Sequence, residues 1–174
     1  MGTYALPYKP RLVKRYRYFK QLYADRDAEV RYDSLSVTAL TLVVDTPVPV
    51  EELVWARENI RGTTANWDRK FSDIEYDHER LERGAYSWEQ GPYTLAAIEE
   101  HGGICVDQAY YAAIGARAHG IPTLKFSGMG RRGPHAWIGY MKRGSDWELD
   151  VGRYAYDKYA TGKATNPQTN RLMT

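Results

Sequence analysis

Apolar and polar segments alternate along the first part of the chain, and most of the apolar segments have helical length. The β-branched run at 35–44 fits either a strand or a buried helix, and the proline-containing segment 45–49 ends it. Residues 50–60 carry two acidic residues in their first turn and predict a helix that Gly62 ends. A second helical pattern runs through 65–73.

The next segments predict two helices around a pair of glycines. Residues 86–92 predict a loop, and 93–100 predict a short helix that stops at the glycines. A longer helix is predicted at 105–119, and Ala109, Ala112, Ala113 and Ala116 give it a smooth face for close packing. Its end is marked by Gly120 and Pro122.

The pattern then changes to short strand-like runs. The expected strands are Thr123–Ser127, His135–Tyr140 and Asp146–Leu149. The glycine-rich segment 128–133 and the turn at 142–145 separate them, and such short connections favour neighbouring antiparallel strands. Helices followed by a small antiparallel sheet predict an α+β fold.

Length and charge limit the number of domains and the kind of partner. The chain has 174 residues, which fits one domain, expected at 25–174. Its 24 Lys and Arg against 22 Asp and Glu give a net charge of +2, too balanced to indicate nucleic acid as a partner. Residues 1–24 are basic and rich in tyrosine, and we expect them to form an arm or short helix laid over the domain.

The cysteine content and the hydropathy of the chain give weak indications of its cellular compartment. The single cysteine excludes an internal disulfide and suits a reducing compartment such as the cytoplasm. No stretch approaches 18 apolar residues, and the basic N-terminus lacks the apolar core of a signal peptide, so we expect no membrane span. The polar segment 165–170 is also compatible with the chain being one module of a longer protein.

Cys105 is the strongest candidate for chemistry, because it follows two glycines and opens a predicted helix. The partial positive charge of a helix N-terminus favours a thiolate, which is the nucleophilic form of cysteine. His135 begins a strand after a glycine-rich turn, where its imidazole could take the thiol proton. Asp150 ends the next expected strand, where a carboxylate could orient that imidazole.

In order and spacing, these segments resemble the core of the transglutaminase-like superfamily, over about residues 93–152. The resemblance implies a papain-like α+β fold with N-terminal helical embellishment, and a Cys105, His135 and Asp150 triad. It also implies that no cofactor or metal is needed. The matching pieces are Gly102-Gly103-Ile104-Cys105-Val106-Asp107-Gln108-Ala109-Tyr110-Tyr111, Gly120-Ile121-Pro122, His135-Ala136-Trp137 and Trp147-Glu148-Leu149-Asp150.

Two further groups of site residues are weaker candidates. The backbone N–H of Cys105 would supply one oxyanion donor. The family often uses a side chain upstream of the cysteine as the second, and Trp88, Gln90 and Trp67 are the candidates here. The glycine-rich segment before His135 is either a flexible turn or a rim of the site, whose arginines, Arg131 and Arg132, would contact an acidic substrate.

Other motifs are better explained without chemistry. Residues 128–133 spell G-x-G-x-x-G, but a dinucleotide site requires that motif to open a helix, and here a proline and a strand follow. One cysteine and four dispersed histidines give no zinc spacing. We expect His101 and His119 to be cap or loop residues and His78 to be solvated.

The sequence therefore predicts a thiol enzyme, a cysteine protease, amidase or acyltransferase acting on a peptide or protein amide. An acyl-thioester on Cys105 would pass its acyl group to water or an amine. The alternative is a catalytically silent transglutaminase-like module that binds protein.

Overall fold

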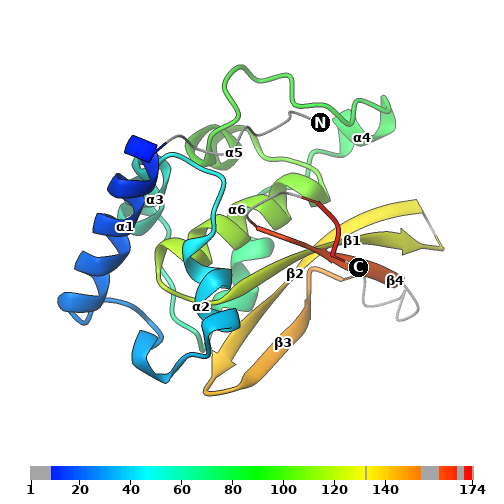
Figure 1. Cartoon of the computed structure of the whole chain (residues 1–174). Coiled ribbons are helices and arrows are strands. Elements are labelled where there is room, and N and C mark those ends of the chain that lie inside the picture. The colour runs from blue at the N-terminus through cyan, green and yellow to red at the C-terminus, as the bar shows by residue number, and fades with distance from the viewer. Residues whose placement is uncertain (1–8, 132, 154–160, 168–170, 174) are drawn as a thin grey trace.

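The computed structural model describes residues 9–131, 133–153, 161–167 and 171–173. Helices cover one face of a four-stranded antiparallel sheet, and the helix that begins at Cys105 packs directly on that sheet (Figure 1). The α+β architecture expected from the sequence is therefore confirmed, with the additional helices placed ahead of the cysteine in the chain.

The helical part contains six α-helices and two short 3-10 helices among the described residues. The 35–44 run is a helix rather than a strand, because the Ser36 hydroxyl caps it by accepting a hydrogen bond from the Ala39 N–H at 3.2 Å. The helices are α1 Lys9–Ala24, η1 Tyr32–Ser34, α2 Val37–Val44, α3 Val50–Asn59, η2 Trp67–Phe71, α4 His78–Glu82, α5 Leu95–His101 and α6 Cys105–Ala118.

The sheet contains the three expected strands, extended at their ends, and a fourth that the sequence pattern did not reveal. The strands are β1 Thr123–Gly130, β2 Gly133–Arg143, β3 Asp146–Val151 and β4 Thr161–Thr165, in the order β3-β2-β1-β4. β4 escaped notice because it is short, largely polar and pairs along only one edge, so no apolar alternation marks it.

The glycine-rich segment before His135 is mostly strand, which corrects the expectation of a flexible turn over 128–133. β1 continues to Gly130 and β2 resumes at Gly133, so they form a tight hairpin. Gly128 pairs with both neighbouring strands, and a side chain there would collide with the carbonyl oxygen of Thr161. Glycine at this position is therefore required by the close approach of β4.

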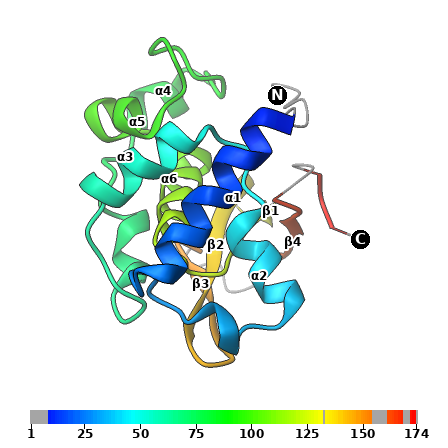
Figure 2. The same cartoon turned by 60° about the vertical axis from the view of Figure 1, so that its left-hand side comes forward.

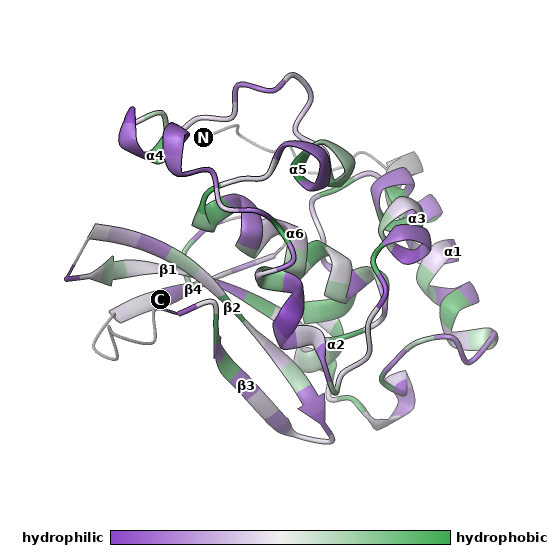
Figure 3. Cartoon of the chain, turned by 180° about the vertical axis from the view of Figure 1, so that it is seen from behind, coloured by the Kyte–Doolittle hydropathy of each residue, from purple (hydrophilic) through white to green (hydrophobic). Residues whose placement is uncertain are grey.

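The core lies where α6 meets the sheet. The alanines predicted to form the smooth face of α6 are buried, and they pack with Ala136, Ile138 and Tyr140 of β2. α3 packs on α6 with α1 beside it, and α2 contacts both α6 and β1 (Figure 2). The peripheral α4 is mostly hydrophilic, whereas hydrophobic segments meet between α6 and the sheet (Figure 3).

Trp67 links the N-terminal helices to this core. Its side chain is fully buried, and its indole N–H donates to the carbonyl oxygen of Ala112 at 2.9 Å. Replacing such a residue with alanine typically costs about 3–5 kcal/mol of stability, so η2 is a structural element of the core. Separately, no helix among the described residues is long and apolar enough to cross a membrane.

Candidate functional site

Cys105 is the first residue of α6, and the two preceding glycines are what allow the chain to turn into that helix. Gly102 has a φ of +73°, and a Cβ there would lie 2.6 Å from the carbonyl oxygen of Glu75. A Cβ on Gly103 would lie 2.5 Å from the Asp107 Cβ. The positive φ at Gly102 and the close contacts at both positions require glycine, so this pair sets how the chain enters α6.

The thiol of Cys105 is half-buried, and its surroundings act on its pKa in both directions. Burial raises the pKa above the ordinary thiol value, and the nearby charge of Asp107 acts in the same direction. Backbone hydrogen bonds to the sulfur from Ala136, Val106 and Cys105 itself act the other way. The net result is a raised pKa.

This direction differs from the expectation that a helix N-terminus would lower the thiol pKa. The helix N–H groups do favour the thiolate, but loss of solvent around a half-buried sulfur outweighs them. At neutral pH the resting group is therefore the neutral thiol, which needs a base before it can attack.

His135 lies in β2 and is 4% exposed. Its Nε2 lies 2.6 Å from the carbonyl oxygen of Gly152, and its ring stacks on Trp137 with a centroid separation of 6.1 Å. A carbonyl oxygen only accepts hydrogen bonds, so Nε2 carries the proton. In the neutral imidazole, Nδ1 is consequently the basic nitrogen.

The sulfur of Cys105 contacts the backbone of β2, the strand that carries His135. The N–H that hydrogen-bonds the Cys105 sulfur belongs to Ala136, the residue directly after His135. The start of α6 and the start of β2, where Cys105 and His135 lie 30 positions apart in the chain, are therefore in contact.

Asp150 is placed differently from the other two predicted residues. Its carboxylate accepts a hydrogen bond from Arg153 at 2.7 Å and is 61% exposed. Among the described residues no hydrogen bond joins Asp150 to His135, and the contact that orients Nε2 comes from Gly152, two residues further on. The role of Asp150 in a triad stays a prediction.

A buried ion pair next to Cys105 was not foreseen. The carboxylate of Asp107 accepts from Arg80 at 2.8 Å, from the Tyr93 hydroxyl at 3.0 Å and from the Ile104 N–H at 2.9 Å. Arg80 and Asp107 are both almost fully buried. An acidic residue in the first turn of a predicted helix can be recognised in the sequence. Its partner Arg80, 27 residues earlier, cannot be.

Arg80 also holds the loop that follows α4. It donates to the carbonyl oxygens of Ala85 and Tyr86 at 2.9 and 3.3 Å, and its guanidinium lies 5.5 Å from the Trp88 ring. This loop lies on the same side of α6 as α5 (Figure 1). One side chain therefore fixes both the start of the cysteine helix and the loop beside it.

The three candidate oxyanion donors have separate surroundings. The Trp67 indole is engaged with a backbone carbonyl of α6. Gln90 lies exposed in the loop. Trp88 stacks edge-on against Tyr93, and its buried indole N–H has no hydrogen-bond partner among the described residues. Trp88 is thus held near the first turn of α6 through Arg80, with a buried indole N–H that no described residue accepts.

The remaining candidates are exposed, lie at helix ends or fall outside the described structure. Arg131 is exposed at the tip of the β1–β2 hairpin, and Arg132 lies outside the described residues. His119 caps the far end of α6, and His101 and His78 are exposed at helix ends. Within the described ranges, no three His, Cys, Asp or Glu side chains form a group that could hold a metal ion.

Comparisons with known proteins add a likeness in fold. No protein-family model matches the chain, and no curated protein matches it in sequence. Among solved structures it is similar to one described as "a Putative Cysteine Protease from Cytophaga hutchinsonii", with a TM-score of 0.49 and 18% identity. The match covers 74% of this chain and 47% of the other, so this chain spans about half of that protein's length. The likeness concerns the fold alone.

Proposed function

We propose that this chain is a transglutaminase-like thiol enzyme that opens an amide-type bond in a peptide or protein. The observation that carries the proposal is the meeting of the Cys105 sulfur with the backbone N–H of Ala136, directly beside His135. A nucleophile at a helix start, on the strand backbone that carries a buried histidine whose Nε2 donates to a carbonyl oxygen, supports thiol catalysis.

In the proposed reaction, His135 removes the thiol proton as the sulfur attacks the substrate carbonyl carbon. The raised pKa of Cys105 means that this transfer accompanies attack, rather than preceding it as a resting ion pair. The C–N bond then breaks, and the imidazolium returns its proton to the departing amine. The acyl group remains on Cys105 as a thioester until water or another amine displaces the sulfur.

Three groups would stabilise the two charges that develop during this reaction, on the imidazolium and on the oxyanion. The carbonyl oxygen of Gly152 accepts the Nε2–H of His135 and would stabilise the imidazolium. The backbone N–H of Cys105 and the indole N–H of Trp88 are the proposed donors to the oxyanion. Asp150 is proposed as a third member that acts on this histidine at longer range, a role tested by Asp150→Asn.

We expect hydrolysis, or transfer to a small amine, rather than protein cross-linking. Water is abundant at any exposed thioester, so transfer prevails only where the site excludes water or binds the amine well. The carboxylate nearest the sulfur, Asp107, is neutralised by Arg80 and buried, so it is not displayed to attract a lysine.

A silent protein-binding module remains the second candidate, and two observations favour it. The Cys105 pKa is raised rather than lowered, and the Asp150 carboxylate is paired with Arg153. Both are compatible with a retained fold that no longer needs fast thiol chemistry.

The deciding experiment is acylation of the purified chain by an activated ester, 4-nitrophenyl acetate, followed by intact-mass analysis. We expect one acetyl group on Cys105, released as acetate with time, and no adduct in Cys105→Ala. Peptide substrates offered with a labelled primary amine then separate ammonia release, cleavage and amine incorporation. A Cys105 that acylates no faster than the thiol of the unfolded chain would leave the binding module as the better assignment.

A further inference from the structure

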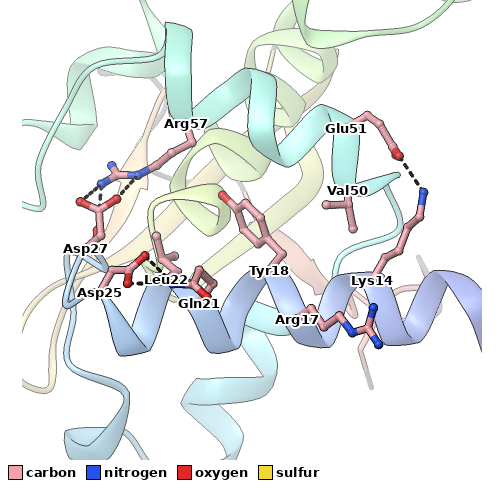
Figure 4. A pocket seen from close by; sticks show the side chains of 10 residues that line it. All are labelled: Lys14, Arg17, Tyr18, Gln21, Leu22, Asp25, Asp27, Val50, Glu51 and Arg57. Atoms are coloured by element: carbon pink, nitrogen blue, oxygen red, sulfur yellow. Dashed lines mark hydrogen bonds and ion pairs between the residues drawn. The ribbon is translucent and has the colours of Figure 1, made fainter.

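Buried and exposed ion pairs differ in how firmly they position other groups. In the hollow between α1 and α3, Lys14 pairs with Glu51 at 3.3 Å, and both side chains are more than half exposed (Figure 4). Water can replace such a contact at little cost, so it fixes little. The side chains of Arg80 and Asp107 are only 3% and 2% exposed, and neither can leave the other without stranding a buried charge. A pair of this kind also holds whatever else is bonded to it.

Arg80 is itself mounted on the segment that leads into α6. It belongs to α4, and the Asp77 side chain that caps this helix accepts from the Arg80 N–H at 2.8 Å. The N–H of Asp77 donates to the carbonyl oxygen of Gly103 at 3.1 Å. Gly103 lies so close to Asp107 that a side chain there would collide with it. These contacts close a ring, so Arg80 cannot shift relative to the start of α6 without breaking several hydrogen bonds.

The same arginine clamps the start of the loop that follows α4. Both polar backbone groups of Ala85 are bonded to it: the N–H donates to the Arg80 carbonyl oxygen at 3.0 Å, and the carbonyl oxygen accepts from Arg80 Nε at 2.9 Å. Nη2 donates to the carbonyl oxygen of Tyr86 at 3.3 Å. No backbone hydrogen bond between described residues involves 87–91. Arg80 is therefore the main buried polar attachment of this loop.

Trp88 lies two residues after this clamp, and its ring is held by the same unit. The Arg80 guanidinium lies 5.5 Å from the ring, and Tyr93 packs edge-on against it with a centroid separation of 5.4 Å. The Tyr93 hydroxyl in turn donates to Asp107 at 3.0 Å. The indole is thus located relative to α6 through Arg80 and Asp107, although the chain that separates it from α6 is long.

We propose that Arg80 is a positioning residue for the thiol reaction, which sets where the Trp88 indole lies relative to Cys105. This rests on the proposed function, in which that indole N–H donates to the oxyanion. The N–H is covered by protein and has no acceptor among the described residues, so reaching the oxyanion requires a small movement of the loop. The clamp at Ala85 and Tyr86 is the fixed point of that movement. Arg80 itself touches neither the substrate nor the reacting atoms.

The test is a double-mutant cycle on the rate at which 4-nitrophenyl acetate acylates the thiol of the full chain. Arg80→Lys keeps a cation for Asp107 but lacks the planar fork that reaches both carbonyl oxygens. Trp88→Phe removes the donor and should slow acylation by about 10²-fold. Arg80→Lys should slow it by about tenfold when Trp88 is present and by less than about twofold in the Trp88→Phe background, because its effect passes through the indole.

The matched control is Arg83→Lys, the same substitution on the same helix. Arg83 also reaches the loop, through Glu89 at 3.5 Å, but both side chains are about half exposed. Such a surface contact contributes little, so the acylation rate should stay within about twofold of wild type. Urea unfolding of every variant ensures that rates are compared between folded chains.

Several results would overturn this inference. Equal losses from Arg80→Lys in the two backgrounds would show that it acts on the fold and not through Trp88, and a full rate in either single variant would remove the positioning role. A wild-type chain that is not acylated rejects the proposed function together with this inference, so the wild-type rate tells the two failures apart. If Arg80→Lys does not fold, Tyr93→Phe replaces it, because losing one hydroxyl loosens the same unit. A several-fold loss that needs Trp88 then supports the inference, and any other result rejects it.

Discussion

The two ends of α6 each lie beside a buried histidine, and the two histidines are bonded in ways that give them different chemistry. At the cysteine end, His135 donates from Nε2 to the Gly152 carbonyl oxygen, which leaves Nδ1 as the basic nitrogen. At the other end, Nδ1 of His119 lies 2.5 Å from Arg57 Nη1. A guanidinium only donates, so the basic nitrogen of His119 is already occupied.

The comparison shows that burial alone does not make a histidine catalytic. Burial and the adjacent Arg57 charge lower the pKa of His119 to about 4, so it stays neutral at physiological pH. His119 therefore acts as a fixed acceptor that links α3 to the end of α6. His135 is held by a carbonyl group, which stabilises a protonated ring and suits proton transfer.

The largest expected difference between the two histidines is in reaction rate. His135→Gln should slow acylation of Cys105 by 4-nitrophenyl acetate at pH 7 by about 10²–10⁴-fold, the usual contribution of a general base. His119→Gln should leave that rate within about twofold, because its side chain lies at the far end of the helix. Nitrophenolate release measures both rates, and similar losses in the two variants would remove His135 from its proposed role.

A large loss of stability is expected at the cysteine end from Arg80→Met. Removing one partner of a buried ion pair leaves the Asp107 carboxylate uncompensated and typically costs about 3–5 kcal/mol. The matched control is Arg83→Met, because Arg83 makes only exposed ion pairs with Glu79 and Glu89 and should lose under about 1 kcal/mol. Urea unfolding gives both values, and equal losses would contradict a special role for the buried pair.

His119, at the far end of α6, should make the free energy of unfolding depend on pH. The folded pKa of His119, about 4, lies below its ordinary value of 6.5, so the unfolded chain binds the proton more readily. The contribution of neutral His119 to the free energy of unfolding is fully present above pH 6.5. It is lost as the pH falls from 6.5 through 4, by up to about 3 kcal/mol. His119→Gln, whose amide oxygen can still accept from Arg57, should flatten the unfolding free energy between these pH values. An unchanged slope would show that other groups cause it.

A smaller effect is expected on the reactivity of the thiol itself. Because burial and the Asp107 charge raise its pKa, Cys105 should react with iodoacetamide at pH 7 more slowly than an ordinary exposed thiol. Asp107→Asn removes the charge, keeps an acceptor for the Ile104 N–H and should raise the rate by several-fold. Because this variant also leaves the buried Arg80 without its carboxylate, the rate is compared at temperatures where urea unfolding shows the variant to be folded. Mass spectrometry across a pH series measures this, and a rate that stays high well below the ordinary thiol pKa would restore the lowered pKa expected from the sequence.

The smallest structural effect is expected from Asp150→Asn. Its ion pair with Arg153 is exposed, so stability should change by less than about 1 kcal/mol. Because the variant stays folded, its acylation rate reports only the chemical role of Asp150. A loss approaching about 10⁴-fold would place Asp150 in a triad, whereas an unchanged rate would leave Gly152 as the group that orients His135.

Features with local causes were readable from the sequence alone. The glycines before Cys105, the alanine face of the following helix and its end at Gly120 all depend on neighbouring backbone conformation. The order of the three expected strands followed from short connections, and β4 was missed because its pairing depends on a partner far along the chain.

Features that depend on contacts between distant segments were decided only by the tertiary structure. The sequence by itself determined that Cys105 opens a helix and that His135 lies in a strand. Only the fold decided how buried the sulfur is, and so the direction of its pKa shift. It also placed Arg80 against Asp107 and the Gly152 carbonyl against His135. The physical reason is that desolvation and buried charge pairing depend on everything within a few ångströms, whichever part of the chain supplies it.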